Sequence, residues 1–263
     1  MSAPVHIRTM AEYTAAGEAP EVLFWVGCAG SFDDRAKKIT KAFAKLLNAA
    51  GVKFAVLGQE ESCSGDPARR AGNEFLFQMQ AMQNIAVLNG YGVRRIVTAC
   101  PHCFNTLKNE YPELGGLYEV QHHTQFINQL LKEGRLKVQG GSFQGKRIVF
   151  HDPCYLGRGN GEYEAPREVL AKLDSELVEM KRSRAKGLCC GAGGAQMFKE
   201  AEPGNKEVNI ERSEEALGAK PTVIAAGCPF CNTMLTDGVK HFNKEADVQV
   251  KDIAELIAEA ADL

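Results

Sequence analysis

The stretch IVTACPHCFNTL, residues 96–107, has a near copy in VIAAGCPFCNTML, residues 223–235. Each stretch is an apolar run of strand length, followed by a Cys-Pro-x-Cys motif and a short helix-like segment. The two motifs, Cys100 to Cys103 and Cys228 to Cys231, begin 128 residues apart. Similarity at a fixed distance along the chain indicates an internal duplication. The whole sequence is therefore read as two related halves.

The other five cysteines follow the same duplication. Four of them form two pairs that each enclose 34 residues and lie 126 residues apart, namely Cys28 with Cys63 and Cys154 with Cys189. The fifth, Cys190, has Ser64 at its matching position. The Cys-Cys-Gly motif of the second half thus corresponds in sequence to a degenerate Cys-Ser-Gly motif in the first.

Each half alternates short apolar runs with longer amphipathic segments, which predicts alternating strands and helices. The expected strands cover residues 22–26, 52–57, 95–99 and 118–121, then 147–150, 176–180, 222–226 and 248–250. The expected helices cover residues 33–50, 67–89, 104–110 and 124–132, then 165–173, 206–217, 232–239 and 252–261. This order predicts an α/β protein with two tandem, pseudo-symmetric parallel lobes.

The duplication also suggests domain boundaries. The turn-rich stretch QGGSFQGK, residues 139–146, separates the halves. We expect an N-terminal extension at residues 1–20, a first cysteine-rich repeat at 21–139 and a second at 146–263.

The cysteines follow predicted strands, and the carboxyl ends of parallel strands meet at one sheet edge. We therefore expect each lobe to gather its own thiols there, as multidentate metal binding requires. The candidate ligands are Cys28, Cys63, Cys100 and Cys103 in the first lobe, and Cys154, Cys189, Cys190, Cys228 and Cys231 in the second. No catalytic residue stands out, and spacing alone leaves iron and zinc open.

Three other interpretations remain open at this point. Cys-x-x-Cys is also a zinc-binding spacing. Cys-Pro-His-Cys between a strand and a helix is also typical of thioredoxin-like thiol–disulfide exchange, although such a dithiol leaves the other cysteines unexplained. A non-enzymatic assembly module with structural clusters is the third.

Composition excludes several classes of function. The 263 residues carry 31 basic and 33 acidic side chains, so nucleic acid is not an expected partner. The longest apolar stretch, residues 22–30, is too short to span a membrane, and the amino terminus lacks a signal-peptide pattern. We expect a cytoplasmic protein with no transmembrane segment of its own. Nine cysteines in a reducing compartment indicate metal or redox chemistry rather than disulfides.

Some neighbouring residues fit a cluster pocket. Gly65 and Gly191 allow backbone amides to approach sulfur closely. His102 and His151 adjoin cysteines and are expected to hydrogen-bond to sulfur or to pack, rather than to bind metal. One helix has an apolar series that predicts a buried face, formed by Phe75, Leu76, Met79, Met82 and Ile85.

Several stretches carry a family resemblance that covers the chain from about residue 21 onward. They are FWVGCAGSFDDRAKK, CSGDPARRAGNEF, CPHCFNTLKNEYP, HDPCYLGR, CCGAGGAQMF and CPFCNTML. The pattern resembles the cysteine-rich CCG domain found in heterodisulfide reductases of the B-subunit type, in glycolate and lactate oxidation iron-sulfur proteins, and in membrane-associated electron-transfer-flavoprotein:quinone reductases. The last group is the most similar.

The resemblance implies a non-cubane 4Fe-4S cluster on the five cysteines of the second lobe. In the first lobe, Ser64 departs from the family pattern, which leaves a second, cubane 4Fe-4S cluster, a serine-ligated cluster or an empty site as alternatives.

The resemblance also implies a function, that of an iron-sulfur oxidoreductase subunit passing electrons between a flavoprotein and a membrane quinone-linked partner. The flavoprotein donor would be of the electron-transfer flavoprotein type. No ferredoxin-type cysteine motif occurs in the sequence, so a ferredoxin-type or membrane-anchored redox subunit is an expected partner. It would hold this chain peripherally on the inner face of the membrane. Heterodisulfide reduction and glycolate or lactate oxidation are the alternatives within the family.

Overall fold

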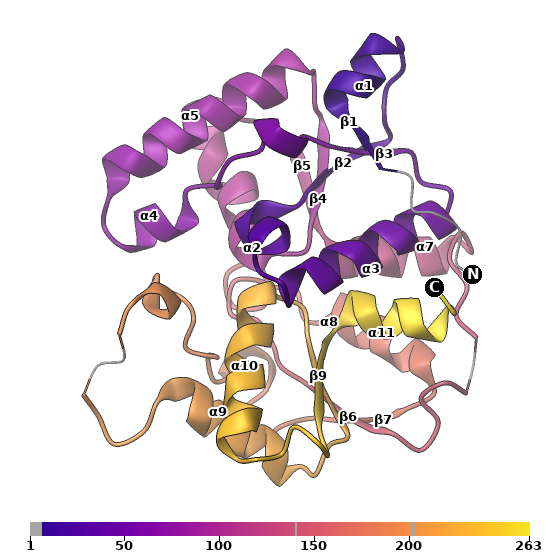
Figure 1. Ribbon diagram of the computed structural model, residues 1–263, viewed down its shortest axis with the longest axis vertical. Helices are drawn as coiled ribbons and strands as arrows, with labels where there is room; N and C mark the ends of the chain where they lie inside the picture. Colours follow the sequence, from indigo (N-terminus) through magenta and orange to yellow (C-terminus); the bar gives the residue numbers. More distant parts are fainter. Residues whose placement is uncertain (1–6, 140, 201–202) are drawn as a thin grey trace.

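Two parallel sheets, one from each half of the sequence, form the framework of the protein (Figure 1). The computed structural model describes residues 7–139, 141–200 and 203–263. The first sheet has the order β1-β3-β2-β4-β5 and the second β7-β6-β8-β9, with every pairing parallel. The strands are β1 (Arg8–Thr9), β2 (Val22–Trp25), β3 (Phe54–Val56), β4 (Arg95–Thr98), β5 (Glu119–His122), β6 (Arg147–Phe150), β7 (Glu176–Val178), β8 (Val223–Ala226) and β9 (Gln249–Asp252).

The order β3-β2-β4-β5 in the first sheet matches β7-β6-β8-β9 in the second. The predicted fold of two tandem parallel α/β lobes is therefore confirmed. Strand β1 has no counterpart in the second sheet and pairs with β3 through Arg8 and Thr9. Two residues are too few to show a period-2 pattern, so the sequence does not predict this strand. The first six residues of the predicted N-terminal extension, and residue 140 in the predicted boundary, lie outside the described residues.

Helices from both lobes pack between the two sheets (Figure 1). Helix α3 packs against α11, and α7 packs against α8. The α-helices are α1 (Met10–Ala15), α2 (Gly27–Phe32), α3 (Ala36–Ala49), α4 (Asp66–Arg70), α5 (Glu74–Gly90), α6 (Pro101–Asn105), α7 (His123–Lys132), α8 (Glu164–Leu170), α9 (Val208–Gly218), α10 (Pro229–His241) and α11 (Ile253–Ala260). Six short helical segments complete the described part of the fold: η1 (Gly58–Glu60), η2 (Thr106–Glu110), η3 (Tyr111–Leu114), η4 (Ala171–Leu173), η5 (Arg184–Lys186) and η6 (Gln196–Phe198).

Both hydrophobic cores contain residues of both lobes. One core joins Phe24 and Phe43 of the first lobe to Phe150 and Leu256 of the second. The other surrounds the cysteines and includes Trp25 and Phe104 of the first lobe, together with side chains of β8 and α10. The lobes are thus duplicated in topology but share their packing.

The expected helix at residues 67–89 is two helices, α4 and α5. The chain turns at Gly72, which has a φ of 88°, and the Asn73 side chain accepts a hydrogen bond from the Leu76 amide to begin α5. A positive φ favours glycine, so Gly72 marks this break.

The predicted buried face of α5 is wrong for four of its five residues. Phe75 is 76% exposed and Met82 is 60% exposed, and Leu76 and Met79 also face solvent. Among the five, only Ile85 is buried, beside Phe77 and Leu88. The helix has apolar residues on both faces, so periodicity alone does not identify the face that packs.

None of the helices in the described part of the chain combines the length and apolar character needed to cross a bilayer.

Candidate metal centre

The first-lobe cysteines gather where β2 and β4 end. Cys28 lies in α2 directly after β2, and Cys63 precedes α4. Cys100 is the N-cap of α6, and Cys103 lies within that helix. The thiol of Cys28 lies beside that of Cys63, and the thiol of Cys103 lies beside that of Cys100. These four residues line a small pocket of about 10 Å³.

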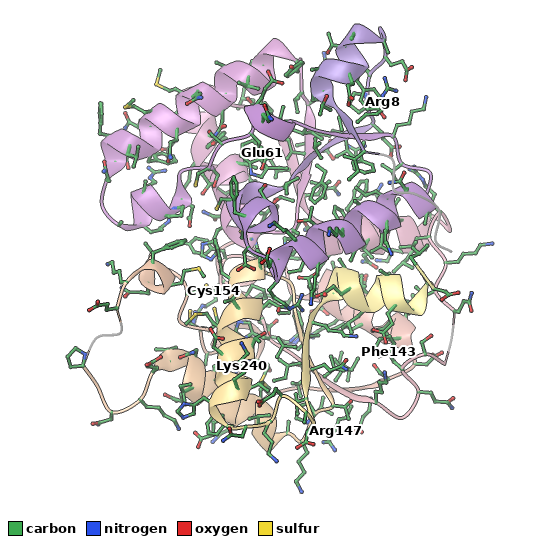
Figure 2. All side chains as sticks on the ribbon, in the orientation of Figure 1. Arg8, Glu61, Phe143, Arg147, Cys154 and Lys240 are labelled. Atoms are coloured by element: carbon green, nitrogen blue, oxygen red, sulfur yellow. The ribbon has the colours of Figure 1, made fainter. Side chains whose placement is uncertain are left out.

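The second lobe repeats this arrangement with five thiols. Cys154 follows β6 and contacts Cys189, which in turn contacts Cys190. The Cys190 thiol lies 3.2 Å from Sγ of Cys231, and Cys231 contacts Cys228, the N-cap of α10. Figure 2 shows Cys154 beside the amino end of α10, at the boundary between the lobes.

The two sets of thiols meet at the lobe boundary. Cys100 of the first lobe lies beside Cys228 of the second, so the two Cys-Pro-x-Cys motifs adjoin each other. The prediction that each lobe gathers thiols at its own sheet edge did not include this contact. All nine cysteines are free thiols, and five are buried. The arrangement therefore differs from the isolated dithiol of a thioredoxin-like protein.

Both helices begin one residue after the first cysteine of their motif, with proline in the first turn. We expected them to begin after the second cysteine, at Phe104 and Asn232. The earlier start follows from proline, whose fixed φ suits the first helical position and whose missing N–H costs no hydrogen bond there. In the first lobe α6 continues into the π-helical segment η2.

Two glycines direct backbone amides at sulfur, as expected. The Gly65 amide lies 3.5 Å from Sγ of Cys63, and the Gly191 amide lies 3.3 Å from Sγ of Cys189. Both glycines have a φ near 90°, at 91° and 92°. A Cβ on Gly65 would lie 2.7 Å from the Phe77 ring, so glycine is required there for conformation and for space.

Hydrogen bonds among the thiols favour ionisation of particular cysteines. A hydrogen bond from Cys28 is the main cause that lowers the pKa of Cys63 to about 7. Burial opposes ionisation of Cys228, but hydrogen bonds from Cys100 and Cys231 lower its pKa to about 5. Hydrogen bonds from Cys154 and Cys190 hold the pKa of Cys189 well below its usual range. Thiolates are the form that binds metal.

Ser64 occupies the structural place of Cys190. Its hydroxyl lies 3.5 Å from Sγ of Cys103, just as the Cys190 thiol lies 3.2 Å from Sγ of Cys231. Ser64 and Cys190 are 2% and 3% exposed. The first lobe therefore presents four sulfurs and one hydroxyl where the second presents five sulfurs.

His151 lies against the second set of thiols. One of its ring nitrogens and the sulfurs of Cys190 and Cys231 lie within 4.8 Å of one another. Nδ1 of His151 accepts a hydrogen bond at 3.0 Å from the buried guanidinium of Arg212. The proton of the neutral ring is therefore on Nε2, so His151 can donate a hydrogen bond only through that nitrogen. Burial, followed by the charge of Arg212, lowers the pKa of His151 to about 3.

His102 has a different partner in the first lobe. Its Nδ1 lies 2.9 Å from Oδ2 of the buried Asp66, which also accepts a hydrogen bond from Arg70. The ring packs against Tyr155 and Phe230 of the second lobe, with the Tyr155 centroid 4.6 Å away. His102 thus has a packing and hydrogen-bonding role, as its position beside Cys103 suggested.

Two charged residues near the thiols, the buried Arg212 and the half-buried Glu61, were not predicted from the sequence. The Glu61 carboxylate accepts hydrogen bonds from the amides of Val26 and Gly27, at 3.0 and 2.5 Å. Burial raises the pKa of Glu61 to about 7, although these two amides partly oppose the shift. Glu61 lies two residues before Cys63, which was its only available signal. Arg212 lies in the middle of a helix among other charged residues, so no sequence pattern distinguishes it.

The donor set fits an iron-sulfur cluster. Iron-sulfur clusters take thiolate ligands, and amide donors to sulfur adjust their reduction potential. Both kinds of group converge in each lobe, around Cys63 with Gly65 and around Cys189 with Gly191.

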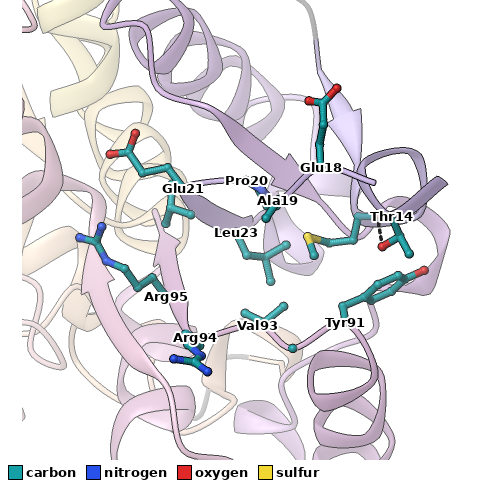
Figure 3. A pocket seen from close by; sticks show the side chains of 13 residues that line it. Thr14, Glu18, Ala19, Pro20, Glu21, Leu23, Tyr91, Val93, Arg94 and Arg95 are labelled. Atoms are coloured by element: carbon teal, nitrogen blue, oxygen red, sulfur yellow. Dashed lines mark hydrogen bonds between the residues drawn. The ribbon is translucent and has the colours of Figure 1, made fainter. Parts of the chain in front are cut away.

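A separate surface pocket of about 390 Å³ lies at the opposite edge of the first sheet (Figure 3). Its lining includes Leu23 and Arg95 from the amino ends of β2 and β4, together with Glu18 and Tyr91. No cysteine lines it, so it is not part of the thiol site.

Comparison with known proteins follows the same division into halves. The family described as a cysteine-rich domain, CCG, matches residues 22–108 and 148–236. The chain is 49% identical over 255 residues to the iron-sulfur-binding oxidoreductase FadF of Bacillus subtilis, covering 97% of this chain and 36% of that protein. It is 44% identical to the EtfAB:quinone oxidoreductase of Syntrophomonas wolfei, covering 93% of this chain and 35% of that protein.

A more distant relative belongs to the dihydromethanophenazine:CoB–CoM heterodisulfide reductase of Methanosarcina barkeri. This reductase chain is 34% identical, with 92% of the present chain and 59% of the relative covered. The present chain thus spans about a third of the length of the first two relatives. Both matched segments contain the duplicated cysteine motifs, with Ser64 replacing one cysteine in the first, and the chain belongs to the CCG cysteine-rich domain family.

Proposed function

We propose that this chain is the iron-sulfur electron-transfer part of an oxidoreductase, with one cluster in each lobe. The observation that carries the proposal is the convergence of nine free thiols into two sets that meet at Cys100 and Cys228. Relatives named as iron-sulfur or quinone oxidoreductases support it.

The cysteines are the proposed ligands. In the second lobe a 4Fe-4S cluster, non-cubane in type, would be held by Cys154, Cys189, Cys190, Cys228 and Cys231. In the first lobe a second 4Fe-4S cluster would be held by Cys28, Cys63, Cys100 and Cys103, with Ser64 beside them. Bound clusters of this kind supply one-electron redox chemistry.

The protein's own contribution is to bury, orient and polarise the sulfurs. Cys100, Cys103, Cys190, Cys228 and Cys231 are each at most 5% exposed, which limits access of water and oxygen. The amides of Gly65 and Gly191 donate toward sulfur in each lobe. Such donors stabilise added negative charge and therefore favour the reduced state.

A flavoprotein donor and a membrane quinone-linked partner are the proposed ends of the electron path. The similarity to a protein named EtfAB:quinone oxidoreductase supports this choice. We propose that a ferredoxin-type or membrane-anchored redox partner holds the chain peripherally at the inner face of the membrane.

Anaerobic mixing with a flavoprotein tests the donor. The reduced electron-transfer flavoprotein of the same organism should bleach the iron-sulfur absorbance of this chain within seconds. Cys228→Ser, at the amino end of α10, should lose much of that response, and His241→Gln, at the exposed end of the same helix, is the control. Bleaching by dithionite but not by the flavoprotein would exclude this donor. Reoxidation by a thiol disulfide and not by a quinone analogue would favour the heterodisulfide alternative.

A further inference from the structure

The two lobes place different residues behind equivalent thiols. The 126-residue offset aligns His151 with Trp25, and the 128-residue offset aligns Arg212 with Asn84. The second lobe thus has an imidazole and a guanidinium where the first lobe has an indole and an amide. The side chains behind the sulfurs therefore differ in charge and in hydrogen-bonding groups between the two lobes.

In the second lobe these residues form a relay from a cation to sulfur. Arg212 is fully buried, at 0% exposed, and donates through Nε to Nδ1 of His151. The remaining ring nitrogen of His151 carries a proton and has no hydrogen-bond partner among the described residues. The ring lies with Cys190 and Cys231 in one buried group. The buried cation and the imidazole that it polarises thus lie beside the proposed cluster ligands.

The carboxylates that act on Arg212 are also paired with other arginines. Glu215 is 3.5 Å from Arg212 but accepts hydrogen bonds from Arg182 at 2.6 and 2.7 Å. Asp152, the carboxylate next to His151 in sequence, is held by two nitrogens of Arg167 at 2.8 and 3.0 Å. Each carboxylate is therefore shared with another arginine.

The first lobe lacks an equivalent relay in its described residues. Asn84 donates to the Cys63 carbonyl and to the Tyr111 hydroxyl, both neutral groups. Trp25 is buried and its Nε1 finds no acceptor within the described part of the chain. The imidazole beside Cys103, that of His102, is bonded to the carboxylate of Asp66 instead of to a cation, and Arg70 is paired with Asp66 and Glu110.

We infer that the Arg212–His151 relay gives the second-lobe centre a higher reduction potential than the first-lobe centre, so that an electron shared between the lobes resides in the second. The physical reason is that a positive charge and an N–H donor near sulfur stabilise the more negative, reduced state. This inference rests on the proposed function, since it requires redox-active clusters.

Redox titration of the loaded protein, followed by electron paramagnetic resonance, tests it. Arg212→Gln removes the charge while keeping a donor, and we expect an about tenfold lower ratio of reduced to oxidised second-lobe cluster at a fixed potential, which is about 59 mV for a one-electron couple. Arg212→Lys keeps the positive charge, so its reduction potential should be close to that of the unaltered protein. The matched control, Arg147→Gln, removes a charge at the amino end of β6, away from the thiols (Figure 2), and should leave the potential unchanged.

An unchanged potential in Arg212→Gln, with full iron content, would overturn the inference. Arg212 is fully buried, so replacing it also affects folding. A second test therefore uses the protein with Arg212 in place. The first signal to appear during stepwise reduction should be the one that Cys190→Ser alters, and the reverse order would contradict the inference. Protein that never binds iron would instead refute the proposed function, so the two failures are distinguishable.

Discussion

A single atom distinguishes the two sets of candidate ligands at one position. Ser64 and Cys190 occupy equivalent buried places, each beside the last cysteine of its lobe. The duplication predicted this equivalence from sequence, and the geometry of both side chains agrees with it. The difference between the proposed centres should therefore depend largely on whether oxygen or sulfur stands there.

Exchanging these two residues tests this dependence. Ser64→Cys should give the first-lobe centre a spectrum resembling that of the second, because five sulfurs are then present in both lobes. Cys190→Ser should make the reverse change. Both are measured by electron paramagnetic resonance together with iron content. Spectra that stay the same in both variants would contradict a ligand or near-ligand role for this position.

Glu61 predicts a pH dependence of stability. Burial raises its folded-state pKa to about 7, from a usual value of 4.5. Between these values the folded protein binds more protons than the unfolded chain, so the free energy of unfolding falls as pH rises through this window. The fall should be about 3 kcal/mol. Denaturant unfolding of Glu61→Gln should lack it, and an identical pH slope in both proteins would refute the assignment.

Residue type and spacing sufficed to predict that the cysteines gather in each lobe and that the Gly65 and Gly191 amides approach sulfur. They did not predict Glu61 or Arg212, because charged residues are usually solvated and burial at these positions arises from tertiary packing. Arg212 reaches His151 across 61 residues of sequence. No local pattern encodes such a contact.

At the scale of elements, the central strands β2, β4, β6 and β8 were the most predictable because each is a short, mainly apolar run beside a turn. Helix α5 was the least predictable. Its apolar residues occur all around the axis, and the packed face is formed by Phe77, Ala81, Ile85 and Leu88. Tertiary packing, rather than the sequence period, selects this face.

Paired substitutions on α5 test that assignment. Phe77→Ala should lower the free energy of unfolding by about 3–5 kcal/mol, because it removes a buried aromatic ring. Met79→Gln, on the exposed face, should change it by no more than about 0.5 kcal/mol. Chemical denaturation of both variants checks the difference. A large loss in Met79→Gln with a small loss in Phe77→Ala would mean that the helix packs through its other face.

At the scale of the whole molecule, the lobes are joined by buried polar contacts as well as by shared cores. His123 of the first lobe lies 2.7 Å from Oδ1 of Asp252 in the second, and both side chains are fully buried. Arg35 binds both oxygens of Glu255 across the same boundary. These contacts hold the two sheet edges, and hence the two sets of thiols, together.

The chain should therefore unfold as one unit. Calorimetry is expected to show one transition, with equal calorimetric and van't Hoff enthalpies. His123→Phe should lower the stability of the whole chain by about 1–3 kcal/mol, because it leaves Asp252 buried without this partner. His241→Phe on the surface is the control. Two separate transitions, with only one shifted by His123→Phe, would show that the lobes are independent.

The duplicated topology was predictable at this scale, whereas the meeting of the two thiol sets was not. The repeat fixes the fold within each lobe, because equivalent motifs follow equivalent strands. The relative placement of the lobes depends on how α3 packs against α11 and α7 against α8. Contact between Cys100 and Cys228 is a consequence of that packing.

Iron and acid-labile sulfide per chain, measured on anaerobically purified protein, test the central claim most directly. Two 4Fe-4S centres predict about eight iron and eight sulfide per chain, and two distinct paramagnetic signals on reduction. About four iron, all lost in Cys190→Ser, would contradict a first-lobe centre. Protein that binds no iron after anaerobic reconstitution, or that binds zinc in its place, would contradict the electron-transfer function as a whole.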